Sequence, residues 1–253
     1  MIEPFFFGPC HQPQVLAIYH PPTGGTGQVL TVICPPLLNE YMRTHPALRE
    51  LAVALAGKGQ HVLRFDYRGT GDSFGELGEV VISDWVEDVG LAVREGRELS
   101  GSKMVRLLGV RAGALLACRW AGTSPDVERL VLWDPVPDGS GYLQAMRRLQ
   151  QAIVEPGLSL SDAERRETLH EYAGYRLSER MVEEFHWLDA SVYSSVPNSK
   201  LHVVSTSSEA GFPVPGEGRD LVPFACNWET DIESLLTPRP VLERLISACL
   251  TRS

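Results

Sequence analysis

Residues 107–116 read Leu-Leu-Gly-Val-Arg-Ala-Gly-Ala-Leu-Leu, and this stretch decides the fold. The apolar run from Met104 to Val110 is typical of a buried strand, and the small and apolar residues that follow are typical of a buried helix. Between them lies Gly-x-Arg-x-Gly, whose two glycines leave room for a tight turn. We therefore expect a strand, a sharp bend and a helix, with Arg111 at the centre of the bend.

Further segments repeat this unit. The runs 28–34, 62–66, 127–133 and 201–205 are almost continuously apolar, which is the pattern of strands buried on both faces of a sheet. Apolar residues at helical spacing separate several of them, so the sequence predicts an α/β fold with a mostly parallel, doubly wound sheet. We also expect residues 15–20 to form a strand in a hairpin with 28–34, and 222–226 to form the last strand.

Residues 138–200 differ from the rest of the chain. They are rich in charges, show helical periodicity around 142–153 and 163–172, and contain no strand pattern. We predict a helical lid inserted above the carboxyl edge of the sheet, between the two parts of one core domain, 1–137 and 201–253. A closing helix is expected over 240–249.

The composition excludes several kinds of partner. The net charge is −9 and the basic residues are scattered, which argues against nucleic acids and anionic membranes. No apolar window approaches the roughly 20 residues needed to insert into a bilayer, and the first residues do not resemble a signal peptide. Five cysteines without a Cys-x-x-Cys pair favour a reducing cytoplasm. No metal-binding spacing occurs, and we expect neither a metal nor a cofactor.

Four features in order resemble the α/β-hydrolase superfamily. They are Pro35-Pro36 after an early strand, the loop Arg-Phe-Asp-Tyr-Arg-Gly-Thr-Gly-Asp-Ser over 64–73, the bend at 109–113 and the helical insertion. More narrowly, residues 109–117 and 130–136 resemble divergent hydrolase-like proteins encoded beside exosortase systems, which are similar in carrying arginine at the bend. The resemblance implies that the bend is the nucleophile elbow of the superfamily.

Two departures bear on the chemistry that this resemblance implies. A standard member carries serine, cysteine or aspartate at the elbow, and Arg111 cannot attack a carbonyl because guanidinium stays protonated. A standard member also has a histidine after its last strand, but no histidine follows His202 in this sequence. We therefore expect no conventional Ser-His-acid triad.

Arg111 has two interpretations, which the sequence leaves open. It can grip the carboxylate or phosphate of a ligand, helped by the amides at the start of the following helix. It can equally form a structural ion pair with Asp134 or Glu40. In the first case Val110 beside it, and Leu37, Asn39 and Glu40 at the place of the oxyanion loop, are further ligand-binding candidates, although these loop residues also suit a helix start.

Two carboxylates are candidate catalytic groups. Asp134 follows the strand 127–133 and Glu209 follows the strand 201–205, so either could activate water, while Asp134 could also bind ligand or cap its strand. Our leading hypothesis is a lidded pocket around Arg111 for an anionic or acylated small metabolite. The alternatives are an ester, thioester or amide hydrolase that uses a carboxylate-activated water, and a scaffold that binds a second copy or another protein through the lid.

Overall fold

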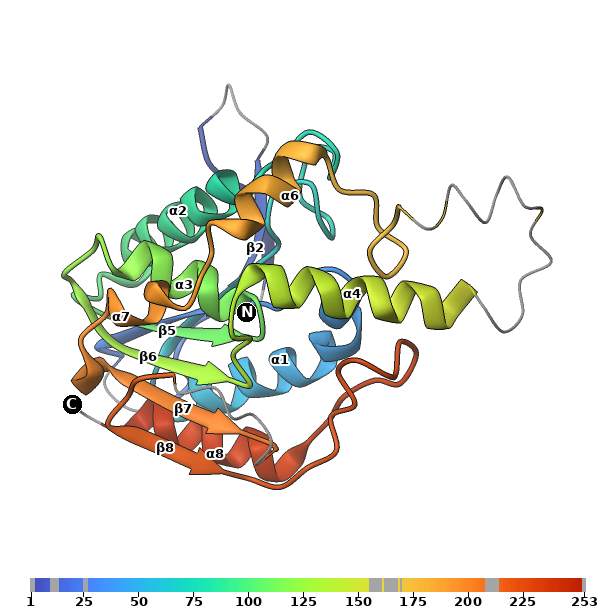
Figure 1. The fold of residues 1–253 in the computed structure, drawn as a ribbon. Helices are drawn as coiled ribbons and strands as arrows, with labels where there is room; N and C mark the ends of the chain where they lie inside the picture. The colour runs from blue at the N-terminus through green and yellow to red at the C-terminus, as the bar shows by residue number, and fades with distance from the viewer. Residues whose placement is uncertain are drawn as a thin grey trace.

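The computed structural model describes residues 3–9, 14–24, 27–154, 161, 168, 170–207 and 214–251. A twisted sheet of eight strands crosses the molecule, with helices on both of its faces (Figure 1). The strands are β1 Glu3–Phe7, β2 Val15–His20, β3 Val29–Cys34, β4 His61–Phe65, β5 Met104–Val110, β6 Val127–Trp133, β7 Leu201–Ser205 and β8 Gly218–Leu221. Their order in the sheet is β1-β2-β4-β3-β5-β6-β7-β8.

The order places a switch point in the middle of the sheet. The strands from β4 to β8 in that order are parallel, while β2 pairs antiparallel with both β1 and β4. From β3 the chain first moves outward to β4 and then returns to β5 on the other side of β3. In open parallel sheets, ligands bind outside the carboxyl ends of the strands at such a point. The fold therefore directs attention to the loops that follow β3 and β5.

The helices cover the sheet in two layers. They are α1 Asn39–Gly57, α2 Ile82–Ser100, α3 Gly113–Ala121, α4 Gly139–Val154, α6 Glu179–His186, α7 Ser191–Ser194, the 3₁₀ turn η1 Asn198–Lys200 and α8 Arg239–Leu250. Side chains of α2 and α3 share one buried cluster with one face of the strands, and side chains of α1 and α8 share a second cluster with the other. The predicted doubly wound architecture is confirmed.

The apolar patterns explain why these elements form. In β5, six of seven residues are buried, as expected of a central strand covered on both faces. In α1, the buried positions Leu48, Leu51, Ala52 and Leu55 recur every three or four residues and form one stripe toward the sheet. The predicted spacing therefore produces the observed core.

Two of the strand predictions are wrong. β2 does not form a hairpin with β3, because both edges of β3 are already paired, with β4 and with β5. The last strand is Gly218–Leu221 rather than 222–226. The backbone continues past it beside β7, where the amides of Val222 and Phe224 donate to Ser205 and Thr206 at 2.8 and 3.1 Å, but Pro223 has no N–H to extend the ladder. β1 was not expected.

The segment between β6 and β7 contains α4, α6, α7 and η1. Figure 1 shows α4 beginning beside the carboxyl ends of β5 and β6 and extending beyond the sheet. The amphipathic stripe predicted over 142–153 is present, with Tyr142, Leu143, Met146 and Leu149 buried. Most of the helix predicted over 163–172 lies outside the described residues, and the boundaries of a lid at 138–200 stay a prediction. No helix in the described ranges is long and apolar enough to span a membrane.

Candidate functional site

Backbone strain gathers at the carboxyl edge of the sheet. Leu38 after β3, Arg111 after β5 and Asp134 after β6 have φ angles of 52°, 52° and 41°. Residues with a side chain rarely adopt positive φ, and each instance costs of order 1–3 kcal/mol. Such strain concentrates at functional sites, and here it marks three neighbouring strand ends next to the switch point.

Close approach of backbones forms the turn that carries Arg111. A Cβ at Gly113 would lie 2.1 Å from the carbonyl oxygen of Pro35, and a Cβ at Gly109 would lie 2.6 Å from the Cα of Ala114. Neither position accepts a side chain without movement of the backbone. The amide of Arg111 donates to the carbonyl of Trp133 at 3.0 Å, which fixes the turn to β6. Packing therefore requires both glycines, Gly109 and Gly113, on the two sides of Arg111.

Three groups hold the guanidinium of Arg111. Its Nε donates to Oε1 of Glu40 at 2.9 Å, and Nη1 donates to the backbone oxygen of Asp134 at 3.2 Å. The guanidinium carbon lies 4.9 Å from the centre of the Trp228 ring, a cation–π distance. The Arg111 side chain is 11% exposed and that of Glu40 is fully buried. Of the two ion-pair partners considered from the sequence, the carboxylate that contacts Arg111 is Glu40.

Burial and charge act in opposite directions on this pair. Burial raises the pKa of Glu40, and the charge of Arg111 opposes that rise. Burial alone would lower the pKa of Arg111, but Glu40, with smaller contributions from Asp134 and Tyr142, raises it, and the net direction is upward. Arg111 is thus a permanent cation at the end of β5. The second carboxylate oxygen of Glu40, Oε2, is buried without a hydrogen-bond partner among the described residues.

Asp134 accepts three hydrogen bonds from neighbouring donors. Its Oδ1 accepts from the amide of Thr206 at 2.7 Å. Its Oδ2 accepts from the Thr206 hydroxyl at 2.6 Å and from Nε1 of Trp228 at 2.9 Å. The carboxylate therefore joins the ends of β6 and β7 and holds the indole of Trp228 against Arg111.

A cavity of about 100 Å³ lies at this cluster. Arg219 of β8 adds a second guanidinium to its wall, anchored by a 2.6 Å hydrogen bond from Nη2 to the carbonyl of Val214. The lining residues are Arg111, Asp134, Pro135, Val203, Ser205, Thr206, Ser207, Val214, Arg219 and Trp228. We call this space the arginine cavity; it has two cations, the carboxylate of Asp134 and several hydroxyls in its wall.

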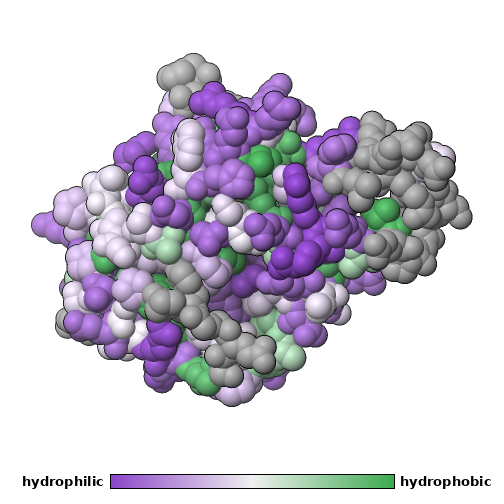
Figure 2. Space-filling view, in the orientation of Figure 1, coloured by the Kyte–Doolittle hydropathy of each residue, from purple (hydrophilic) through white to green (hydrophobic). Residues whose placement is uncertain are grey.

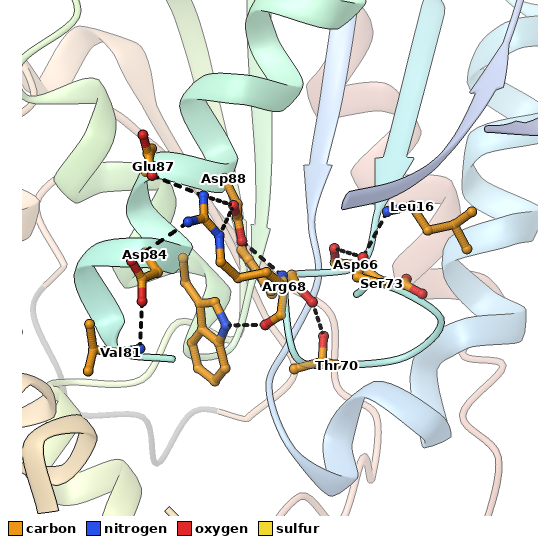
Figure 3. A network of polar contacts seen from close by, with 11 residues as sticks. Leu16, Asp66, Arg68, Thr70, Ser73, Val81, Asp84, Glu87 and Asp88 are labelled. Atoms are coloured by element: carbon orange, nitrogen blue, oxygen red, sulfur yellow. Dashed lines mark hydrogen bonds and ion pairs between the residues drawn. The ribbon is translucent and has the colours of Figure 1, made fainter. Parts of the chain in front are cut away.

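A larger cavity of about 400 Å³ lies beside the loops after β3 and β4. Leu37, Leu38 and Met42 line one side of it, and glycines of the loop 69–77 line the other. Arg68 stabilises that loop, because its Nε and its amide donate to the two carboxylate oxygens of Asp88 at 2.7 and 2.9 Å (Figure 3). We call it the loop cavity; it shares no lining residue with the arginine cavity.

The structure thus separates the residues that the sequence grouped together. Arg111 and Asp134 line the arginine cavity, whereas Leu37 lines the loop cavity. Val110 is fully buried in β5, and Asn39 is buried at the start of α1 with no partner for its amide atoms among the residues described. Glu209 lies outside the described residues.

Sequence reasoning missed three residues that line the arginine cavity: Thr206, Arg219 and Trp228. Each lies in or after a strand of the carboxyl half of the chain, where no periodic pattern marks a side chain as part of a site. Trp228 stands in the loop where the resemblance to hydrolases would place a histidine, and this was the one available signal.

Comparison with known proteins agrees with the fold. The family model of serine aminopeptidase, S33, matches residues 39–166, which span half of the chain and include the turn at Arg111. A search of curated protein sequences returned no match.

Solved structures match over nearly the whole chain. A structure of Est1E from Butyrivibrio proteoclasticus with bound ferulic acid has a TM-score of 0.65 at 15% identity and covers 97% of this chain and 98% of its own. A putative hydrolase from Agrobacterium vitis has a TM-score of 0.61 at 18% identity, covering 98% of both chains. Mouse alpha/beta hydrolase domain-containing protein 10 has a TM-score of 0.60 at 16% identity, covering 98% of this chain and 96% of that one. The structural likenesses and the sheet order show an α/β-hydrolase fold, and the family match over half of the chain places it in the serine aminopeptidase S33 family.

Proposed function

We propose that this protein binds a small anionic metabolite, a carboxylate or phosphate that can carry an acyl group, in the arginine cavity. Binding takes place without a covalent acyl-enzyme intermediate. The observation that carries the proposal is the placement of Arg111, a permanent cation, at the strained turn between β5 and α3 and in the wall of a cavity with Arg219.

The turn is the counterpart of the nucleophile elbow in this proposal. It joins a central strand to a helix, its central residue has φ of 52°, and glycines flank it on both sides. The family is named for serine, yet this chain has arginine there. The same arginine is the basis of the resemblance to exosortase-associated proteins, which we retain as part of the proposal.

Arg111 has the capacity to hold a ligand while it stays paired with Glu40. A guanidinium has five N–H donors. Glu40 and the Asp134 carbonyl accept from two of them among the described contacts. Arg219 brings a second positive charge to the same cavity. Paired cations with fixed N–H directions favour carboxylate and phosphate over neutral groups.

Hydrolysis through a carboxylate-activated water has weaker support. A general base needs a free lone pair directed at the water. Three donors already occupy the carboxylate of Asp134, so most of its lone pairs face Thr206 and Trp228 rather than a water. Asp134 is better suited to hold Trp228 in place.

The test is anion binding with a matched pair of arginine variants. We expect acetate, short-chain carboxylates or alkyl phosphates, but not their neutral amide or alcohol analogues, to raise the melting temperature. Ligand at about 100 times its Kd adds about 2.7 kcal/mol to stability. Arg219→Ala removes a cation from the cavity without breaking the Arg111–Glu40 pair. It should weaken binding about ten- to a hundredfold, the loss of a charge-assisted hydrogen bond.

Arg94→Ala is the control, because Arg94 is an exposed arginine on α2 outside the cavity lining. It should leave affinity unchanged. Equal weakening by both substitutions would mean that anions sense only overall charge. Equal stabilisation by neutral analogues, or none by any anion, would refute the proposal.

A further inference from the structure

An uncharged groove of about 400 Å³ opens beside the arginine cavity. Its wall is formed by the end of β8, the chain that follows it and the two residues after β7, and two of its side chains, Leu221 and Phe224, are 53% and 38% exposed. The lining residues are Thr206, Ser207, Leu221, Pro223, Phe224, Ala225, Cys226, Asn227 and Trp228, none of them charged at neutral pH. Figure 2 shows hydrophobic surface at the lower edge of the molecule, in the region where β8 ends in Figure 1. We call it the C-terminal groove.

The C-terminal groove adjoins the arginine cavity. Thr206, Ser207 and Trp228 line both of them. Trp228 stands at the junction, with its ring 4.9 Å from the Arg111 guanidinium carbon and its indole nitrogen bonded to Asp134. A ligand held at Arg111 therefore has apolar surface within reach on the side of Trp228. The loop cavity, which is of similar size, shares no residue with the arginine cavity.

Buried contacts hold the floor of the C-terminal groove in place. Arg43 of α1 is 1% exposed, and its two terminal nitrogens donate to the carbonyls of Cys226 and Asn227 at 2.9 and 3.2 Å. On the other side, the amide of Phe224 donates to the carbonyl of Thr206 at 3.1 Å. A groove fixed in this way loses little conformational entropy when a ligand enters.

We propose that the ligand is amphipathic, with an anionic head at Arg111 and Arg219 and an apolar chain or ring in the C-terminal groove. This inference rests on the proposed function and specifies its substrate class: medium-chain acyl or aromatic carboxylates, or the corresponding phosphate monoesters. Exposed Leu221 and Phe224 are the side chains that the apolar part covers.

Isothermal titration calorimetry with two homologous series tests this assignment. Unbranched carboxylates and alkyl phosphates from two to ten carbons are titrated below their micelle concentrations. Each methylene that enters the groove should lower Kd about two- to fourfold, from the transfer free energy of a buried methylene. Comparison of the two series identifies which anionic head the site prefers.

Two alanine variants show which cavity holds the alkyl chain of the ligand. Phe224→Ala removes an exposed ring of the C-terminal groove and should flatten the dependence on chain length while short anions bind as before. Met42→Ala, which truncates a 65% exposed side chain of the loop cavity, should leave that dependence intact.

The outcomes separate the two proposals. If short anions bind through Arg219 but chain length has no effect, the anion site stands and the amphipathic ligand is refuted. If Met42→Ala flattens the dependence of Kd on chain length and Phe224→Ala does not, the alkyl chain of the ligand occupies the loop cavity. The assignment of that chain to the C-terminal groove is then wrong. If no anion binds at any length, both proposals fail.

Discussion

Replacement of Arg111 by methionine tests how the buried ion pair contributes to stability. Methionine keeps an unbranched apolar side chain beside Trp228 but leaves the fully buried Glu40 without its partner. Removal of one member of a buried pair costs about 3–5 kcal/mol. Because the Arg111 side chain is 11% exposed, so that some water reaches the pair, we expect about 3 kcal/mol, at the lower end of that range.

A double variant separates the ion pair from packing. In Arg111→Met/Glu40→Gln no unpaired charge remains, and its stability should lie within about 1 kcal/mol of the native protein, as for buried pairs replaced by neutral residues. The coupling energy from the complete cycle should therefore be about 2 kcal/mol or more. Urea unfolding followed by tryptophan fluorescence measures all four proteins.

The cost of Arg111→Met should also depend on pH. Burial raises the pKa of Glu40 above its ordinary value of 4.5, so the folded state binds more protons than the unfolded state and loses stability as pH rises above that value. Arg111 opposes this rise, and its removal extends the loss to higher pH. We expect a smaller cost at pH 5 than at pH 8.

Three results would contradict this reasoning. They are a cost below about 1 kcal/mol for Arg111→Met, a double variant no more stable than the single one, and a cost independent of pH. Any of these would show that Glu40 does not depend on Arg111 for its burial.

Further substitutions test other parts of the account. Asp134→Asn turns one acceptor into a donor facing Trp228 or the loop after β7, and should cost about 1–3 kcal/mol in urea unfolding; an unchanged midpoint would contradict the bonding described. Gly113→Ala should abolish folding or reduce soluble yield sharply, whereas Gly57→Ala, with no atom within 4 Å of the added methyl, should be tolerated; equal behaviour of the two would be inconsistent with the tight turn. Burial raises the pKa of Asp88 to about 6, so the free energy of unfolding should fall as pH rises from about 4 to about 6. Asp88→Asn should weaken that fall. An unchanged pH profile of stability in this variant would contradict the raised pKa.

The fold was predictable because its core strands are apolar on both faces. The run at β5 and the glycines around Arg111 specify a buried strand and a tight turn by local sequence alone. The partners of β2 and the place of the last strand were not predictable, because edge pairing depends on which strand edges remain free in the folded sheet. Local pattern contains no such information.

Of the residues that line the arginine cavity, the sequence identified Arg111 and Asp134. Arg111 could be recognised from the turn, but Glu40 lies 71 residues away, and the sequence could not choose between it and Asp134 as partner. Arg219 and Trp228 reach the cavity from β8 and from a loop without periodic pattern. Their positions follow from the packing of the chain after β7.

The most direct test of the anion site is a crystal structure of the protein with octanoate brominated at its terminal carbon. The account predicts carboxylate density at Arg111 and Arg219, with the anomalous signal of bromine in the C-terminal groove near Phe224. Bromine in the loop cavity would refute the proposed position of the ligand's alkyl chain. Carboxylate density away from Arg111, with Glu40 as that side chain's only anionic contact, would contradict the central claim that this arginine recognises the ligand.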